Sequence, residues 1–396
     1  MTTTDNASVG MAIDRDHADL RDAVKRLCAR FPGRYWQELD EKNAYPDEFV
    51  NAMGENGFLA ALIPEQYGGS GLPFRAAQVI LQTVHEEGCS AIACFAQMYT
   101  MGTMLKHGNE DQKTRYLPKI ATGELRLQAF GVTEPGAGTE TLKLKTRATR
   151  AGDHYLINGQ KIWTSRVAHS DLMLLLARTT PYEEMRHKKH GLSVFLVDVR
   201  EGVKDGTIKI SPIPIMTNHL TYEVFFNNAR VPVENRIGEE GEGFSYILSS
   251  MNAERTLACG MILGNGYWFI RKAVDYANQR VVFGRPISAN QGIQFPIAHA
   301  YANLEAADMM ARRAACLLDA GRGSGFEANT SKHLAAEAAW EAAEVCMQTY
   351  GGFGVAREFD VERVWRDTRH FRTAPISTNL ILAFIGQNVL GMPKSY

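Results

Sequence analysis

The 396-residue sequence has no excess of charge of either sign and no long hydrophobic run. Its 43 Lys and Arg residues stand against 44 Asp and Glu residues, which gives a formal net charge of −1. This balance provides no general electrostatic attraction to nucleic acid or to an anionic membrane surface. No segment approaches the roughly 20 apolar residues that a membrane-spanning helix needs. We therefore expect neither nucleic-acid binding nor insertion into a membrane.

Cysteine is also scarce. The 6 cysteines are widely scattered, with no Cys-x-x-Cys pair and no grouping with His at the spacing of a metal site. We expect no bound metal, and six inert buried thiols that suit a reducing compartment. Residues 1–9 are polar and have neither the apolar core of a signal peptide nor the Arg-rich pattern of a transit peptide. The sequence thus predicts a cytoplasmic protein.

The patterning of the chain divides it into three blocks. Residues 16–124 repeat apolar side chains at helical spacing, with Pro and Gly clusters between the segments. Residues 125–235 consist of short apolar or alternating runs that predict antiparallel strands, and the Asn-Gly dipeptide at 158–159 predicts a hairpin turn. Residues 236–396 return to helical spacing with long Ala-rich stretches, which are typical of a bundle. We predict an α+β fold with a flexible N-terminus at 1–15, followed by a helical, a β and a second helical domain.

Two segments at predicted strand ends have a composition that suits a flat ligand. The segment 133–140 is rich in Gly and hydroxyl groups, so it can present backbone N–H groups to a phosphate or to the edge of a heterocycle. Trp163, Thr164 and Ser165 place an aromatic plane and two hydroxyls at a second strand end. Taken alone, the segment 133–140 also fits a plain surface turn, and Trp163 also fits a side chain in the core of the sheet. Neither follows the GxGxxG pattern of a Rossmann nucleotide site.

Glu254 is more informative than either segment. It falls on an apolar series of a predicted helix, spaced by 4, 3, 4 and 3 residues: Ile247, Met251, Glu254, Ala258 and Met261. A carboxylate that faces the interior must be paired, protonated or functional. Arg255 points about 100° away around the helix, so it is not a simple partner. Three interpretations of Glu254 therefore stay open. It forms an ion pair with a distant basic residue, it lies on a stripe that is partly exposed, or it has a functional role.

Taken together, these segments resemble the acyl-CoA dehydrogenase family over about residues 16–390. The motifs that carry the resemblance follow the family's order and spacing: 64–71, 112–117 before 123–124, 133–140, 159–165, 280–287, and 348 through Arg366-Asp367. The resemblance implies an N-terminal helical domain, a middle antiparallel β domain and a C-terminal four-helix bundle. It also implies FAD between the β domain and the bundle, and a homotetramer built as a dimer of dimers.

The resemblance further implies a set of ligand-binding residues. The isoalloxazine is expected to be lined by Phe130, Val132 and Thr133 and covered near N5 by Trp163 and Ser165. The pyrophosphate and adenosine end is expected to be held across a subunit interface by Arg280, Phe283, Gln348, Gly351 and Gly352, and closed over by Ser377 and Asn379. Thr139 is expected to reach the ligand or pyrophosphate region, and Arg255 to lie near the CoA moiety.

The activity implied is α,β-dehydrogenation of an acyl-CoA thioester to the trans-2-enoyl-CoA. A glutamate removes the α-proton, the β-hydride passes to flavin N5, and electron-transfer flavoprotein reoxidises the flavin. Most members carry the glutamate after the Arg-Asp pair, where this chain has Pro375. Members similar to isovaleryl-CoA and long-chain acyl-CoA dehydrogenases carry it on the helix that here holds Glu254. Because Pro375 has no N–H, either Ile376 or the ribityl hydroxyl of FAD must bind the thioester oxygen.

Two other activities stay open on the same fold. The first is a flavin monooxygenase or oxidase, against which the presence of Glu254 argues. The second is a non-catalytic assembly subunit, against which the presence of Trp163 and Ser165 argues. The length and branching of the acyl chain stay undetermined, because the Met-rich segment 95–104 expected behind the thioester is adaptable.

Overall fold

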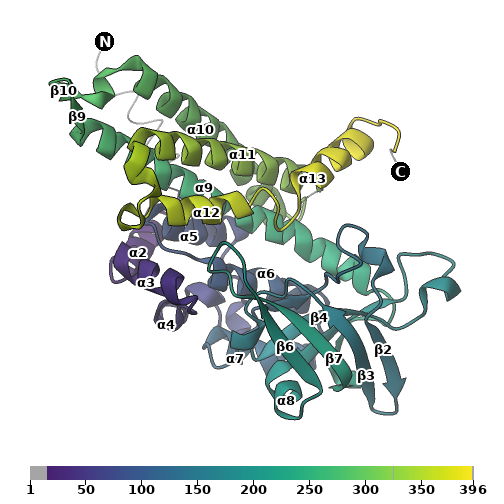
Figure 1. Cartoon of the computed structure of the whole chain (residues 1–396). Helices are drawn as coiled ribbons and strands as arrows, with labels where there is room; N and C mark the ends of the chain where they lie inside the picture. The colour runs from purple at the N-terminus through teal and green to yellow at the C-terminus, as the bar shows by residue number, and fades with distance from the viewer. Residues whose placement is uncertain (1–15, 324, 395–396) are drawn as a thin grey trace.

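The computed structural model describes residues 16–323 and 325–394, so the N-terminus predicted to be flexible lies outside them. The first part of the chain is helical, with α2 (Ala18–Cys28), α3 (Gly33–Lys42), α4 (Asp47–Glu55), α5 (Phe74–Glu86), α6 (Ile92–His107) and α7 (Glu110–Ala121). Helix α3 shows little apolar periodicity, because its sequence is mostly polar and only Trp36 is buried. Figure 1 shows these helices beside the sheet and below the long C-terminal helices.

The middle of the chain forms an 8-stranded sheet with the strand order β6-β7-β3-β2-β4-β5-β8, and with β1 beside β4. The strands are β1 (Ala129–Gly131), β2 (Arg147–Ala151), β3 (His154–Lys161), β4 (Leu172–Arg178), β5 (Leu192–Asp198), β6 (Ile208–Ile213), β7 (Thr221–Pro232) and β8 (Arg236–Ile237). The pairing is antiparallel throughout, except that β1 and β2 each meet β4 in parallel. The predicted antiparallel sheet is therefore correct for most strands and wrong for β1.

The predicted hairpin turn at Asn158 and Gly159 is wrong. Strand β3 continues through both residues, with a register shift against β7 between Ile157 and Gly159. A Cβ atom on Gly159 would lie 2.7 Å from the Thr146 Cα, so the glycine allows the neighbouring backbone to approach closely. Bulges and hairpin turns both favour glycine, and the dipeptide alone does not distinguish them.

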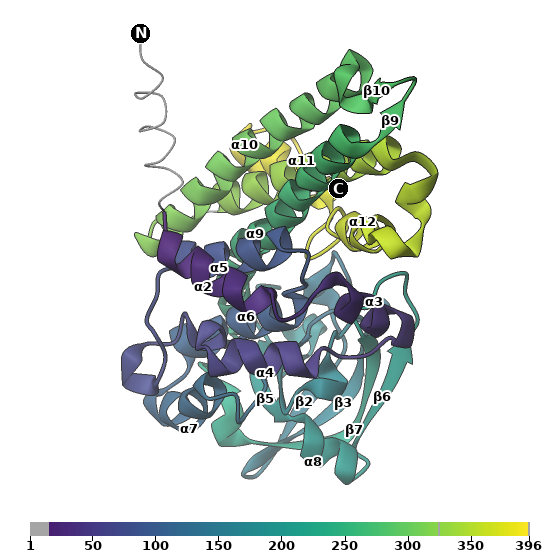
Figure 2. The same cartoon turned by 90° about the vertical axis from the view of Figure 1, so that its left-hand side faces the viewer.

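The last part of the chain is again helical, with α9 (Gly243–Gln279), α10 (Gln291–Asp319), α11 (Gly325–Tyr350), α12 (Val361–His370) and α13 (Thr378–Phe384). Helices α9, α10 and α11 lie along one another, and α12 crosses α11 (Figures 1 and 2). The short strands β9 (Val281–Val282) and β10 (Arg285–Pro286) form a hairpin at the far end of α9. In the described part of the chain, no helix has the length and apolar character to cross a membrane. Cys316 is exposed, so the expectation that all six thiols are buried is wrong for this one.

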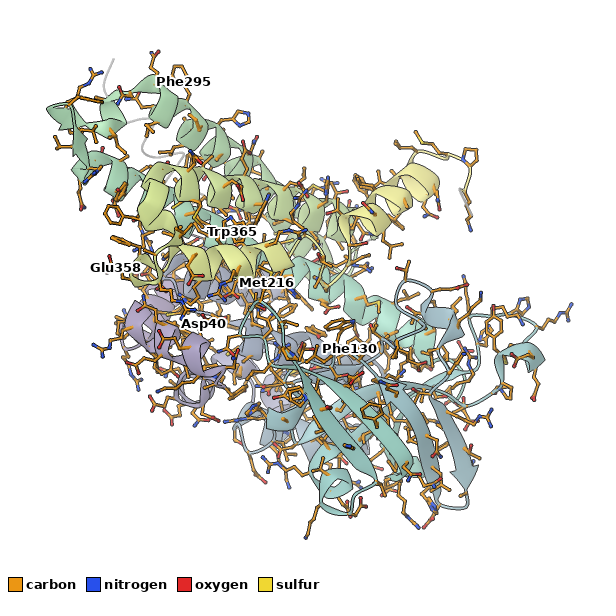
Figure 3. The ribbon with its side chains drawn as sticks, viewed as in Figure 1. Asp40, Phe130, Met216, Phe295, Glu358 and Trp365 are labelled. Atoms are coloured by element: carbon orange, nitrogen blue, oxygen red, sulfur yellow. The ribbon has the colours of Figure 1, made fainter. Side chains whose placement is uncertain are left out.

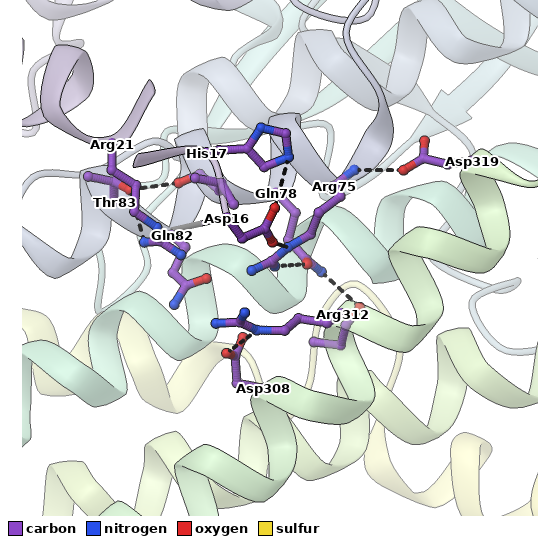
Figure 4. A network of polar contacts seen from close by, with 12 residues as sticks. Asp16, His17, Arg21, Arg75, Gln78, Gln82, Thr83, Asp308, Arg312 and Asp319 are labelled. Carbon is purple, nitrogen blue, oxygen red and sulfur yellow. Dashed lines mark hydrogen bonds and ion pairs between the residues drawn. The ribbon is translucent and has the colours of Figure 1, made fainter. Parts of the chain in front are cut away.

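Helices α5 and α9 meet at a close seam that fixes the position of α9. A Cβ atom on Gly260 would lie 2.4 Å from the Gln78 carbonyl oxygen, and one on Gly264 would lie 2.4 Å from the Gln82 carbonyl oxygen. The Gln78 amide donates to the Thr256 carbonyl at 2.8 Å, two residues beyond Glu254. A network of polar contacts surrounds the same seam (Figure 4). The N-terminal helices therefore set the position of the helix that carries Glu254.

Candidate active site

Glu254 lies on α9 within the predicted apolar stripe. Ile247, Ala258 and Met261 are buried, whereas Glu254 itself is partly exposed. Burial raises the pKa of Glu254 to about 7, and the positive charges of Arg255 and Arg166 oppose this shift. A carboxyl group with such a pKa can exchange a proton near neutral pH, as a general base must.

Tyr99 on α6 joins Glu254 to the sheet. Its hydroxyl interacts with the Glu254 carboxylate, and this hydrogen-bonding interaction lowers the pKa of Glu254. Burial and the nearby carboxylate raise the pKa of Tyr99 well above its usual value. The Tyr99 ring also meets the Phe130 ring edge to face, with centroids 5.8 Å apart. Tyr99 lies in the Met-rich segment 95–104 but was not predicted as a site residue, because nothing in the local sequence marks its contact with α9.

The two segments predicted to hold a flat ligand lie side by side. The Ile162 backbone N–H donates to the Thr133 carbonyl at 2.9 Å. Trp163 is 53% exposed at the end of β3, which is unusual for so large an apolar ring. The adjacent Thr164 hydroxyl is buried and has no hydrogen-bond partner in the described residues. The exposed aromatic plane of Trp163 fits a flat ring, such as an isoalloxazine.

A buried ion pair fixes the loop that follows Thr133. Lys161 Nζ lies 2.9 Å from Glu134 Oε1 and also donates to the Val132 carbonyl at 3.0 Å. Burial lowers the pKa of Lys161 to about 8, and the charge of Glu134 opposes this shift. Glu134 accepts two further hydrogen bonds, from the backbone N–H groups of Lys145 at 2.6 Å and Thr146 at 2.8 Å. The loop is therefore held against β3 on the side of Trp163.

A second buried lysine fixes the segment that contains Pro375. Lys332 on α11 donates to the Phe371 carbonyl at 2.6 Å and to the Ile376 carbonyl at 2.7 Å. Burial lowers the pKa of Lys332 to about 8, and its charge lowers the pKa of Glu254. Ser377 follows this segment and caps α13, while Asn379 in the first turn of α13 is exposed. Lys332 was not identified from the sequence, because an Ala-rich helix gives no sign of a functional cation.

Within one chain, the remaining predicted cofactor residues do not lie with the residues around Glu254 and Trp163. Arg280, Phe283, Gln348, Gly351 and Gly352 are exposed, at the ends of α9 and α11 near the β9–β10 hairpin. Figure 3 shows that the hairpin end and the sheet are separate regions, since Phe295 lies at the hairpin end of the bundle and Phe130 lies beside the sheet. Their predicted role across a subunit interface requires a second chain.

The two predicted substrate residues lie apart from each other. Thr139 is exposed on the loop after Glu134. Arg255 is partly buried next to Glu254 and donates to the Asn252 side-chain oxygen at 3.1 Å. No ion pair joins Arg255 to Glu254 in the described residues, although the charge of Arg255 lowers the pKa of Glu254. In the same residues, no cluster of three His, Cys, Asp or Glu side chains could hold a metal ion.

Comparison with known proteins gives matches over nearly the whole chain. Models of the N-terminal, middle and C-terminal domains of acyl-CoA dehydrogenases match residues 14–124, 129–229 and 241–390. An acyl-CoA dehydrogenase of Mycobacterium tuberculosis is 32% identical over 381 residues, which cover 95% of this chain and 96% of the relative. A glutaryl-CoA dehydrogenase of Desulfococcus multivorans is 33% identical over 386 residues, which cover 95% of this chain and 96% of the relative.

Solved structures give the same result. The glutaryl-CoA complex of a glutaryl-CoA dehydrogenase matches with a TM-score of 0.88 and 31% identity, over 95% of each chain. The butyryl-CoA dehydrogenase of Megasphaera elsdenii matches with a TM-score of 0.86 and 28% identity, over 94% of this chain and 98% of that one.

Proposed function

The chain belongs to the acyl-CoA dehydrogenase family of FAD-dependent oxidoreductases, and from this premise we propose that Glu254 is its catalytic base. In the proposed reaction, Glu254 removes the α-proton of an acyl-CoA thioester. FAD, when bound, supplies the acceptor for the hydride that leaves the β-carbon. The single observation that supports Glu254 most is its position, where burial raises the pKa to about 7 beside the Tyr99 hydroxyl. A base with this pKa is about half ionised at pH 7 and is basic enough to take a proton from an activated carbon.

Several residues of the chain are proposed to hold the cofactor. Phe130, Val132 and Thr133 would line the isoalloxazine, and Trp163 and Ser165 would cover it. Ser377 and Asn379 would close over the phosphate and adenine side. The second chain of a dimer within a homotetramer would contribute the exposed residues at the hairpin end of the bundle, namely Arg280, Phe283, Gln348, Gly351 and Gly352. Thr139 and Arg255 would contact the pyrophosphate region and the CoA moiety.

Two further parts of the proposal concern the surroundings of the enzyme. We expect electron-transfer flavoprotein to reoxidise the flavin and the protein to work in the cytoplasm. Lys332 is a positioning residue in this proposal, because it fixes the carbonyls on both sides of the Pro375 segment. That segment would then present the thioester to Glu254 in one orientation.

Glu254→Gln tests the assignment of the base. The change keeps the size of the side chain and removes its basicity, so flavin reduction by acyl-CoA should slow by about 10³-fold, the scale of general base catalysis. Flavin content and acyl-CoA affinity should stay near those of the unmodified protein. The measurement is the rate of flavin bleaching in anaerobic stopped flow, with straight-chain and branched acyl-CoAs.

Glu38→Gln is the matched control, since Glu38 lies exposed on α3 and pairs with the exposed Arg34. It should bleach at the unmodified rate. Unchanged bleaching by Glu254→Gln would exclude Glu254 as the base. Rapid peroxide formation by the reduced, product-bound protein in air would instead favour an oxidase, and a flavin that no acyl-CoA reduces would favour a monooxygenase.

A further inference from the structure

Arg166 carries a buried positive charge with no partner in the described residues. Its side chain is 7% exposed, and its Nε is buried without a hydrogen-bond acceptor. The backbone fixes its place, because the Arg166 N–H donates to the Leu220 carbonyl at 2.7 Å directly after the Trp163–Ser165 segment. Guanidinium groups stay charged in proteins. A buried guanidinium N–H without an acceptor costs free energy, so an acceptor group supplied by a ligand would stabilise it.

The Glu254 carboxylate acts electrostatically on Arg166, but no ion pair joins the two in the described residues. Two other carboxylates, Asp40 and Asp367, are bound to other cations. Asp40 Oδ2 lies 2.7 Å from Arg366 Nη2. Asp367 lies 3.6 Å from the His219 ring, and His219 and Arg363 lower the pKa of Asp367. In the described residues, no acidic side chain therefore forms an ion pair with Arg166.

The guanidinium of Arg166 borders a cavity of about 40 Å³. This volume has room for a carboxylate, since one water needs about 10–15 Å³ on the same measure. One further buried polar atom of the cavity wall, Asn218 Oδ1, has no hydrogen-bond partner in the described residues. The remaining polar wall includes Tyr45 and Ser90. Apolar side chains, among them Trp36, Ile92 and Leu220, form the rest of the wall, so a bound group with an apolar stem and a polar end would contact both kinds of surface.

The cavity lies close to Glu254 through helix α6. Ile92 borders the cavity and Tyr99 interacts with Glu254. These residues are seven positions apart, hence on the same face of the helix and about 10 Å apart along its axis. Arg166 also acts electrostatically on both Tyr99 and Glu254. A molecule that reaches Glu254 would have to extend along α6 by about this distance to place a group at Arg166.

We propose that the substrate is an acyl-CoA whose acyl group ends in a carboxylate, and that Arg166 binds this carboxylate. The inference rests on the proposed function, because it places the thioester end of the same acyl group at Glu254. Arg166 would thus determine specificity between carboxylated and uncharged acyl groups. A site built around an unpaired charge discriminates strongly against a ligand that leaves the charge unpaired.

The test compares thioesters that differ only at the end of the acyl group. Glutaryl-CoA and adipyl-CoA are matched in carbon number with pentanoyl-CoA and hexanoyl-CoA. For the unmodified holoprotein, at least one carboxylated member should exceed its uncharged counterpart by about 100-fold in kcat/KM. Arg166→Gln should bring that ratio close to 1, chiefly through the carboxylated thioester, and Arg166→Lys should retain part of it.

Binding without turnover provides a second readout. Calorimetry would compare the Glu254→Gln variant with the double variant that also carries Arg166→Gln. The second change should lower the affinity for the carboxylated thioester by at least about 10-fold, the loss expected for one charge-assisted hydrogen bond. The uncharged thioester should bind about equally with and without Arg166→Gln. Flavin content should not change. If Arg166→Gln does not fold, the kcat/KM values of the matched thioester pairs on the unmodified protein still test whether the site prefers a carboxylate.

Equal kcat/KM and equal affinity within each matched pair would overturn the inference and leave the proposed function intact. Loss of FAD from Arg166→Gln would also overturn it, since the guanidinium would then serve the cofactor. If no acyl-CoA reduces the flavin, the proposed function fails, and equal affinities in calorimetry would reject the carboxylate site separately.

Discussion

The electrostatic surroundings of Glu254 determine its pKa through opposing contributions from residues distant in sequence. Burial raises the pKa, while Arg255, the Tyr99 hydroxyl, Arg166 and Lys332 each lower it. These four residues come from α9, α6, the end of the β3 segment and α11. A single substitution at any of these positions should therefore change the pH dependence of the reaction while the base itself is retained.

The first prediction at the residue scale concerns this pH dependence. Glu254 must be ionised to accept a proton, so kcat/KM should fall as pH drops below an apparent pKa near 7, the value to which burial raises the group. Tyr99→Phe removes a hydrogen bond that lowers the pKa of Glu254, so the inflection should move to higher pH. The measurement is kcat/KM from pH 5 to 9. Tyr182→Phe, in the partly exposed loop after β4, is the control and should leave the profile in place. A Tyr99→Phe profile that shifts to lower pH would contradict this account.

The second residue-scale prediction concerns stability. The folded protein raises the pKa of Glu254 from 4.5 to about 7, so the folded state binds the proton more tightly than the unfolded state. The resulting stabilisation is present below about pH 4.5 and is lost as pH rises through 7. The Glu254→Gln variant has no such pH dependence. At pH 8 its free energy of unfolding should be about 1–3 kcal/mol higher than that of the unmodified protein, so the variant should be more stable. Urea unfolding at pH 5 and pH 8 measures the difference. An equal difference at both pH values would mean that the gain is not electrostatic.

At the scale of elements, the seam between α5 and α9 gives the third prediction. Gly264→Ala places a Cβ atom 2.4 Å from the Gln82 carbonyl oxygen and 2.6 Å from the His85 Cβ, so the helices must separate. We expect a loss of about 1–3 kcal/mol in unfolding free energy, as for other overpacked cores. The flavin reduction rate should also fall, because α9 carries Glu254. Gly102→Ala on α6 is the control, since its Cβ would meet nothing within 4 Å and alanine favours helix. Equal stability of the two variants would show that the seam tolerates the extra atom.

Elements with strong periodicity were predictable from the sequence, while those that depend on neighbours were not. Helix α7 lies in the block predicted to be helical, and an Asn109 capping box fixes its start. Helix α3 and the bulge at Gly159 depend on packing against other elements, which local sequence does not record. In the site, Glu254 was identifiable because a carboxylate interrupts an apolar stripe. Arg166 and Lys332 were missed, since their importance comes from burial and from partners supplied by distant segments.

At the scale of the whole molecule, helix α9 connects two regions with different exposure. Its 37 residues extend over about 55 Å at 1.5 Å per residue. Glu254 lies in its first part, among buried side chains beside the sheet, and Arg280 follows its last turn at the exposed hairpin end. The hairpin end carries several large apolar side chains in contact with solvent: Val281, Phe283, Phe295 and Val355. Apolar groups in this number are typical of a surface that another chain covers.

Phe283→Asp tests whether the hairpin end is a subunit interface. Phe283 is fully exposed and has a positive φ of 52° in the β9–β10 turn, so the isolated chain gains nothing from its ring. If a second chain covers it, an aspartate there must be buried without a partner, and light scattering should show a smaller assembly. FAD content should fall with it, because Arg280, Gln348, Gly351 and Gly352 reach the cofactor only from the partner in this proposal. Val203→Asp is the control, an exposed apolar residue on α8 (Val199–Lys204) beside the sheet, and should leave both quantities unchanged. An assembly of unchanged mass with full FAD content would exclude Phe283 from the interface, whereas loss of FAD at unchanged mass would place it at the cofactor alone.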